Sequence, residues 1–202
     1  MKKIGIFSGT FDPIHKGHVM FAKEALEQIG LDKIFFLVEP SPRRKQGVKA
    51  FDHRVAMVNL ALKPEPKLAS IVLNHAQFSV LETLPALQAR FKYNEIHFLM
   101  GDDMLNHFTD DQWPHIDEFV RAFRLIIGVR KSSAKNIEEK ITLIEKTRGI
   151  KMQYQTFNTS LPLSSSSRVR TELRKGQHPS EIDDSVWKYI KKENLYSPAT
   201  DL

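Results

Sequence analysis

Two histidines near the amino terminus have a spacing that suits the binding of a single anion. His15 and His18 lie three positions apart in the segment 8–18, SGTFDPIHKGH, so on a helix they would project toward the same ligand. Gly9 would let the backbone approach a phosphate closely, and the following helix start would offer free N–H groups to an anion. The segment predicts a phosphate site with two imidazole donors. The alternatives are an incidental pair or a metal site, for which no third ligand lies nearby.

A serine-rich segment near the carboxyl terminus predicts a second phosphate contact. Residues 165–167 are all serine; they can cap a helix, and their hydroxyls and the free N–H groups could hold the β- and γ-phosphates of a nucleotide. Arg168 and Arg170 are two positions apart and so do not share a helix face. We expect one arginine to reach the phosphates while the other serves elsewhere; the alternative is an ordinary capped basic helix.

Strand-like and helix-like segments alternate along the chain and would position both motifs. Short apolar runs predict strands, and apolar residues at helical spacing predict the helices between them. Gly30 is the expected stop of the first helix, and Pro85 complicates the third. The expected strands are 3–7, 34–38, 71–73, 96–100, 125–129 and 152–156, and the expected helices are 18–29, 55–62, 80–91, 137–144, 165–175 and 184–191.

This alternation is typical of an α/β fold with a doubly wound, mostly parallel sheet. Ligands of such sheets bind beyond the carboxyl ends of the strands, which is where segment 8–18 lies relative to the first strand. No repeat, long linker or low-complexity tract divides the 202 residues. We therefore expect a single domain over residues 1–202, in which residues 160–202 form a carboxyl-terminal helical segment that carries the second motif.

The composition indicates a soluble protein with anionic partners. The net charge of +6 suits phosphorylated small molecules or nucleic acid, but the chain lacks a clustered basic tract with interleaved aromatics, which argues against nucleic acid. The absence of cysteine excludes disulfides, thiolate metal sites and cysteine nucleophiles. No signal peptide and no apolar run near the ~20 residues of a membrane span is present. We expect a cytoplasmic protein that binds neither nucleic acid nor membrane; its oligomeric state stays open.

Taken together, the motifs resemble the nucleotidyltransferase superfamily with the (H/T)xGH signature, and most closely its bacterial nicotinate-nucleotide adenylyltransferases. The resemblance extends over most of the chain and implies a Rossmann-like nucleotidyltransferase fold. Besides segment 8–18, it rests on the proline-rich loop 40–45, Arg54 and Met57 in an RxxM pattern, the strand 98–103 that ends in GxD, Trp113, segment 165–170 as an SSTxIR signature and segment 186–190 as VxxYI.

The resemblance implies roles for individual residues. His15, His18 and Arg170 would be catalytic. The acceptor would be bound by Asp12, Lys45, Thr83 and Trp113, with Trp113 stacking on a pyridine ring; the alternatives are that Asp12 caps its loop and that Trp113 fills a surface groove. ATP would be bound by Ser8, Gly9, Thr10, Phe11, Gly17, Gly101, Asp103, Ser165, Ser166, Ser167 and Arg168.

The activity that the resemblance implies is transfer of AMP from ATP to nicotinate mononucleotide, giving deamido-NAD and pyrophosphate in NAD biosynthesis. A phosphate monoester has a second pKa near ~6 and is already anionic at neutral pH, so no general base is required. Mg²⁺ would travel with ATP, with no separate protein metal site. Alternatives are a pantetheine-phosphate adenylyltransferase, which usually has threonine at the His15 position and a shorter chain, a cytidylyltransferase, and a non-catalytic nucleotide sensor, against which the histidine pair argues.

Departures from the family pattern concern the acceptor side. The family's SYTxDTL segment is replaced by residues 78–84, FSVLETL, Pro114 follows Trp113 where an aromatic is usual, and residues 131–132 replace the usual Pro-Gly. In the proline-rich loop, Arg44 stands where a histidine is usual. Val80 takes the place of a threonine and has no side-chain donor for a carboxylate. We therefore expect nicotinate mononucleotide to be preferred, with weaker discrimination against the nicotinamide form than the family pattern implies.

Overall fold

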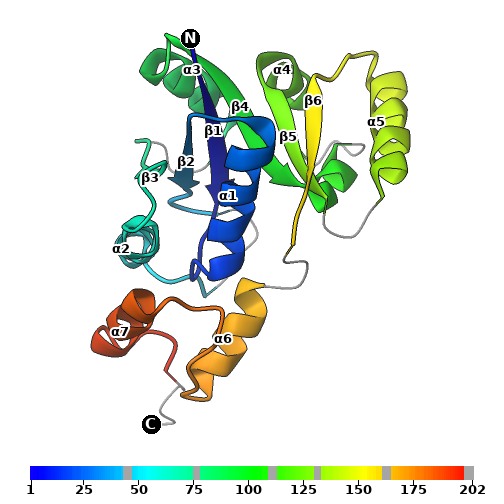
Figure 1. Ribbon diagram of the computed structural model, residues 1–202. Coiled ribbons are helices and arrows are strands. Elements are labelled where there is room, and N and C mark those ends of the chain that lie inside the picture. The colour runs from blue at the N-terminus through cyan, green and yellow to red at the C-terminus, as the bar shows by residue number, and fades with distance from the viewer. Residues whose placement is uncertain (43–46, 75–77, 109–112, 130–132, 161–164, 198–202) are drawn as a thin grey trace.

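The computed structural model describes residues 1–42, 47–74, 78–108, 113–129, 133–160 and 165–197. Within these ranges the chain forms one six-stranded sheet with helices on both faces (Figure 1). The strands are β1 (Lys2–Gly9), β2 (Lys33–Val38), β3 (Leu68–Ile71), β4 (Asn94–Gly101), β5 (Arg124–Val129) and β6 (Tyr154–Asn158). The helices are α1 (Lys16–Ile29), α2 (Phe51–Leu62), α3 (Val80–Arg90), the 3₁₀ helix η1 (Asp102–His107), α4 (Ile116–Ala122), α5 (Ala134–Arg148), α6 (Ser166–Arg174) and α7 (Asp184–Lys192).

The sheet is parallel throughout, with the strand order β3-β2-β1-β4-β5-β6. This confirms the predicted doubly wound fold. The chain builds outward from β1 to β3, then returns to the other side of β1 and continues with β4. The direction of winding therefore reverses between β1 and β4, and the crevice beyond the carboxyl ends of these two strands is where doubly wound sheets bind their ligands.

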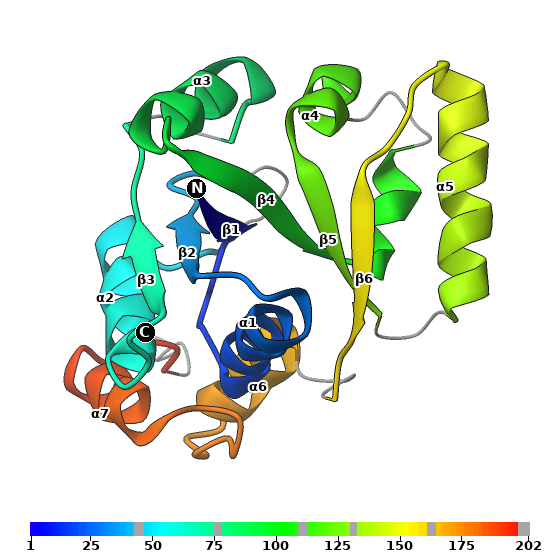
Figure 2. The same ribbon diagram turned by 45° about the horizontal axis from the view of Figure 1, so that its top comes forward.

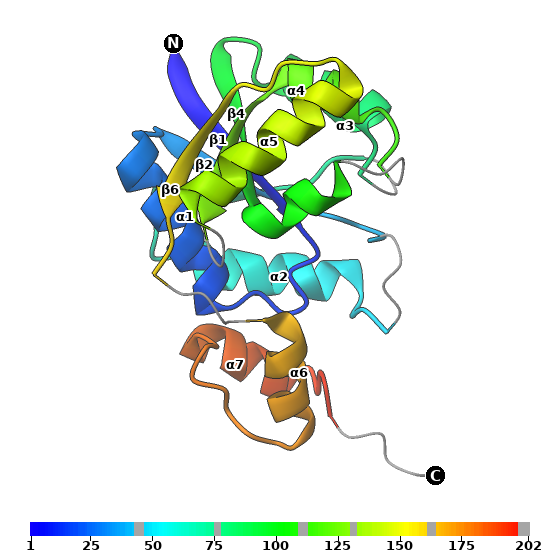
Figure 3. The same cartoon turned by 90° about the vertical axis from the view of Figure 1, so that its right-hand side faces the viewer.

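Two hydrophobic cores lie on the two faces of the sheet because side chains alternate along each strand. In β1, Ile4 and Ile6 pack into one core and Phe7 into the other. The Phe7 face is covered by α1 and α2, and the opposite face by α3, α4 and α5 (Figure 2). The carboxyl-terminal helices α6 and α7 add Val169 and Ile190 to the Phe7 core and lie together beneath α2 (Figure 3).

A close contact sets the position of α1 on the sheet. At Gly128 in β5, an added Cβ would lie 2.2 Å from Cε2 of Phe21, far inside the van der Waals distance. Glycine at this position therefore lets the Phe21 ring of α1 lie directly against the strand. The stacked Phe7 and Phe21 rings, 5.1 Å between centroids, continue this contact toward the start of the helix, where the two histidines lie.

Several predicted boundaries shift in the structure. The strand predicted at residues 71–73 is wrong: β3 covers 68–71, because those residues pair with 34–37 of β2. The first two helices begin earlier than predicted, at Lys16 and Phe51, and Gly30 ends α1 as predicted. Helix α3 continues through Pro85, whereas η1 and α4 are short segments that the apolar spacing did not predict. No helix in the described ranges is both long and apolar enough to cross a membrane.

Candidate active site

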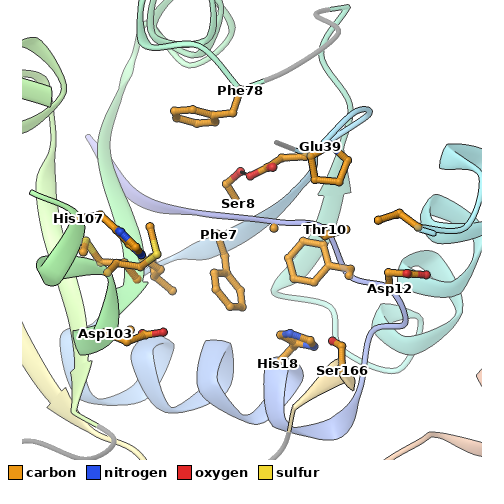
Figure 4. A pocket seen from close by; sticks show the side chains of 18 of the residues that line it. Phe7, Ser8, Thr10, Asp12, His18, Glu39, Phe78, Asp103, His107 and Ser166 are labelled. Carbon is orange, nitrogen blue, oxygen red and sulfur yellow. Dashed lines mark hydrogen bonds between the residues drawn. The ribbon is translucent and has the colours of Figure 1, made fainter. Parts of the chain in front are cut away.

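A cavity of about 900 Å³, which we call the main cavity, opens at the carboxyl ends of β1, β2 and β4. Figure 4 shows Phe78 and Glu39 toward one end and His18, Asp103 and Ser166 toward the other. Residues from separate segments between Phe7 and Arg170 line it, so the fold assembles this site from distant parts of the chain. The predicted site residues that line it are Ser8, Gly9, Thr10, Phe11, Asp12, His18, Gly101, Asp103, Trp113, Ser166, Ser167 and Arg170.

The other predicted site residues have different positions. Lys45 lies outside the described residues, together with Arg44 and residues 131–132 of the altered acceptor segments. Among the described residues, five predicted ones are not part of the main-cavity wall: His15, Gly17, Thr83, Ser165 and Arg168.

The two histidines are stacked, so they do not face the main cavity equally. Their ring centroids are 3.7 Å apart with an interplanar angle of 26°. His15 is the N-cap residue of α1 and is only 5% exposed, whereas His18 lines the main cavity. The backbone N–H of His15 donates to Nδ1 of His18 at 3.2 Å. Because Nδ1 of His18 accepts, the proton of the neutral ring resides on Nε2, which is therefore the donor atom of this ring.

Gly9 and Phe11 shape the wall beside His18. A Cβ at Gly9 would lie 2.9 Å from Cζ of Phe11, so glycine is needed here to accommodate the Phe11 ring. Phe11 itself has a left-handed backbone conformation, with φ 48°, and its ring meets the His18 ring edge-on at 5.2 Å. The loop after β1 therefore folds back on the first turn of α1 and fixes the orientation of the imidazole.

The amino terminus of α6 docks on the same loop. The hydroxyl of Ser166 donates to the carbonyl oxygen of Pro13 at 3.2 Å, and Nη1 of Arg170 donates to the carbonyl oxygen of Asp12 at 2.7 Å. Nη2 of Arg170 donates to Oγ of Ser167 at 3.1 Å. These contacts bring a guanidinium and a helix amino terminus, which favours anions, to the His18 end of the main cavity.

The structure distinguishes the two arginines of the second motif. Arg170 lines the main cavity, whereas the side chain of Arg168 is 61% exposed and forms ion pairs with Glu172 at 3.2 Å and Glu181 at 3.7 Å. Ser165 caps α6 by accepting a hydrogen bond from the backbone N–H of Arg168. Within the second motif, the residues that line the main cavity are therefore Ser166, Ser167 and Arg170.

Arg54 binds the loops that follow β1 and β2. Its side chain is 1% exposed, and burial lowers the pKa of its guanidinium against the opposing effect of the nearby Asp12 carboxylate. Its three nitrogens donate to the backbone carbonyl oxygens of Lys49, Thr10, Glu39 and Pro40 at 2.6–2.9 Å. The RxxM arginine is therefore a buried structural element beneath the cavity wall.

Aromatic rings form the opposite end of the main cavity. The Trp113 ring packs against Phe119 at 5.2 Å and Phe108 at 5.4 Å, and it meets Phe78 edge-on at 6.2 Å. Thr83 lies behind this end, 2% exposed, where its hydroxyl accepts a hydrogen bond from the backbone N–H of Ser79 at the start of α3. This aromatic wall suits a planar ring, which can meet such side chains by offset stacking or edge-on.

Sequence reasoning missed two polar side chains of the wall, Glu39 and His107. Glu39 follows β2 directly, and its Oε1 accepts a hydrogen bond from the Ser8 hydroxyl at 3.0 Å. The sequence does carry a signal for Glu39: it is a polar residue immediately after a buried strand, and the strand ends of a doubly wound sheet meet at the ligand crevice. His107 carries no comparable signal because η1 itself was not predicted.

The fold and the main cavity indicate a nucleotidyltransferase, and comparison with known families supports this class of protein. A family model described as cytidylyltransferase-like matches residues 6–172. The chain belongs to this family of nucleotidyltransferases, whose matched region includes both the histidine motif and the start of α6.

Individual relatives show to which group within this family the chain belongs. The chain is 32% identical to the nicotinate-nucleotide adenylyltransferase of Bacillus subtilis (strain 168), over 97% of this chain and 99% of the relative. It is 30% identical to a probable nicotinate-nucleotide adenylyltransferase of Carboxydothermus hydrogenoformans, over 96% and 98% of the two chains. Within the family, it therefore belongs to the nicotinate-nucleotide adenylyltransferases.

The fold agrees with a solved structure. Plasmodium falciparum nicotinic acid mononucleotide adenylyltransferase, complexed with NaAD, superimposes with a TM-score of 0.77 at 21% sequence identity, over 97% of this chain and 98% of that chain. This likeness supports the Rossmann-like arrangement of the sheet and its helices.

Proposed function

We propose that this protein transfers the AMP moiety of ATP to nicotinate mononucleotide, forming deamido-NAD and releasing pyrophosphate. The observation that carries the proposal is the convergence of His18, Arg170 and the amino terminus of α6 at one end of the main cavity. Its opposite end is walled by Phe78 and Trp113. One end thus suits phosphates and the other an aromatic base, in a chain that belongs to the nicotinate-nucleotide adenylyltransferases.

The chemistry needs positioned donors and no general base. An acceptor phosphate oxygen attacks the α-phosphorus of ATP; the new P–O bond forms as the bond to the α–β bridging oxygen breaks, and that electron pair leaves with pyrophosphate. Negative charge grows on the departing oxygens, where preorganised donors lower the barrier. His18 Nε2–H supplies one such donor, and Arg170 with the free N–H groups of α6 holds the pyrophosphate end.

Mg²⁺ enters as part of the ATP substrate in this proposal. Magnesium usually keeps several waters and binds through substrate phosphates with few protein ligands. Asp103, exposed at the start of η1 and part of the cavity wall, is positioned to accept hydrogen bonds from water or ribose hydroxyls.

The acceptor preference is tested by a substrate panel. Pyrophosphate release is measured with MgATP and nicotinate mononucleotide, nicotinamide mononucleotide or 4′-phosphopantetheine, and nicotinate mononucleotide is expected to give the highest kcat/KM. The Glu39 carboxylate in the cavity wall disfavours a second carboxylate nearby. Glu39→Gln is therefore expected to raise the nicotinate-to-nicotinamide ratio about tenfold, or about 1.4 kcal/mol.

Two results would contradict these assignments. A highest kcat/KM for phosphopantetheine would overturn the pyridine acceptor while leaving adenylyl transfer intact. An equal loss of activity with both pyridine nucleotides in Glu39→Gln would show that Glu39 acts on a part common to both acceptors.

Arg170→Ala is expected to weaken MgATP binding about 10- to 100-fold, since one charge-assisted hydrogen bond contributes about 1.5–3 kcal/mol. The KM for the acceptor should change much less, because the guanidinium lies at the phosphate end of the main cavity. Titration calorimetry with MgATP and steady-state kinetics measure both quantities. Arg174→Ala, which removes an exposed arginine from the last turn of the same helix, is the control. Unchanged ATP affinity and turnover in Arg170→Ala would remove this residue from the site.

A further inference from the structure

The carboxyl-terminal segment after α7 inserts one side chain beneath the loop that carries the histidine motif. Tyr196 is only 3% exposed, and its hydroxyl donates a hydrogen bond to Oδ1 of Asp12. The two residues are 184 positions apart. The contact joins the end of the chain to the wall of the main cavity, because Asp12 is one of its lining residues.

The backbone around Tyr196 indicates that this insertion is specifically maintained. Asn194 and Tyr196 both have left-handed conformations, with φ 49° and 59°. Asparagine often ends a helix in this conformation, but for a bulky residue such as Tyr196 it is costly and persists where the surroundings determine it. Here the Tyr196 ring packs in the Phe7 core and lies under the ammonium of Lys49 at 5.4 Å.

Asp12 connects this tyrosine to the arginine at the phosphate end. Its carboxylate accepts from Tyr196 and, at 3.4 Å, from the backbone N–H of Lys49, while its carbonyl oxygen accepts from Nη1 of Arg170 at 2.7 Å. Asp12 is 3% exposed, so its carboxylate is largely occupied inside the protein. A displacement of Asp12 would move the carbonyl oxygen that orients the guanidinium.

The direction of the tyrosine hydrogen bond is fixed by its surroundings. Burial, together with the negative charge of Asp12, raises the pKa of Tyr196 well above its ordinary value. The hydroxyl therefore stays protonated and donates throughout the physiological pH range.

We propose that Tyr196 is a positioning residue, through which the carboxyl-terminal segment fixes Asp12 and thereby aims Arg170 at the ATP phosphates. The inference rests on the proposed function. It also reassigns Asp12, predicted as an acceptor-binding residue, to a link between the tail and Arg170.

A matched pair of variants tests the proposal. Tyr196→Phe removes a buried hydroxyl. Tyr189→Phe removes the hydroxyl of a partly buried tyrosine in α7, which bonds Nδ1 of His53 at 2.9 Å, away from the main cavity. Tyr196→Phe is expected to weaken MgATP binding and lower kcat/KM for ATP about tenfold, about 1.4 kcal/mol. Tyr189→Phe should keep wild-type values, and thermal unfolding should show that both variants stay folded.

A double-mutant cycle separates positioning from general destabilisation. In an Arg170→Ala background, Tyr196→Phe should cost little further ATP affinity, since the tyrosine acts through that arginine. Wild-type ATP affinity in Tyr196→Phe, or the same loss in both backgrounds, would overturn the proposal. The titration measures MgATP binding without an acceptor, so it tests the role of Tyr196 even if the enzyme reaction fails. The proposed function has a separate test: it would be overturned if no phosphate monoester released pyrophosphate from ATP.

Discussion

His18→Ala is expected to lower kcat by at least ~10²-fold, which is the usual effect in enzymes of removing one preorganised donor from a developing negative charge. His18 lines the main cavity, and its Nδ1 accepts from the backbone of His15, so in the proposed function Nε2–H is the donor that the ring offers to the phosphates. The Phe7 and Phe11 rings hold the imidazole in place at 6.2 and 5.2 Å. The alanine variant loses this donor while the surrounding aromatic packing largely remains.

Pyrophosphate release at saturating MgATP and nicotinate mononucleotide measures the effect, with circular dichroism to verify folding. His18→Asn, which retains a side-chain N–H donor, should recover part of the lost rate. His178→Ala, which removes a partly exposed histidine stacked on Trp187, is the control and should keep wild-type turnover. Near-normal turnover in folded His18→Ala would exclude His18 from transition-state stabilisation.

Arg54→Met is expected to lower the free energy of unfolding by about 3–5 kcal/mol, the usual cost of breaking a buried charged network. Methionine fills similar space, but four carbonyl oxygens lose their donor and the Asp12 carboxylate loses a nearby positive charge. For a chain of this length, the midpoint of thermal unfolding should fall by roughly 10 °C.

Urea denaturation and thermal scanning measure the change, with Arg121→Met on the exposed side of α4 as the matched control. The control should unfold within about 0.5 kcal/mol of wild type, as surface substitutions usually do. An Arg54→Met variant as stable as Arg121→Met would show that water or rearranged backbone replaces the guanidinium. Because Arg54 binds Thr10 and Glu39, ATP turnover measured on the folded fraction should also decrease.

The sequence alone was sufficient for the chemical class and for most of the fold. Segment 8–18 is contiguous, so the order of strand, turn and helix that positions His18 follows from local spacing. The parallel doubly wound sheet followed from the alternation of apolar strands and amphipathic helices. Local patterns were less informative for β3 and α4, where few residues carry a periodic signal and pairing with a neighbour sets the boundary.

Only the tertiary structure decided which residues of each motif line the main cavity. Helical spacing treated His15 and His18 as equivalent, yet capping of α1 buries His15 and exposes His18 to the main cavity. The choice of Arg170 over Arg168 depends on how α6 docks against a loop 158 positions away in sequence. The contact between Tyr196 and Asp12 spans 184 positions. Such contacts arise from the packing of helices on the finished sheet, and no local pattern in one sequence encodes them.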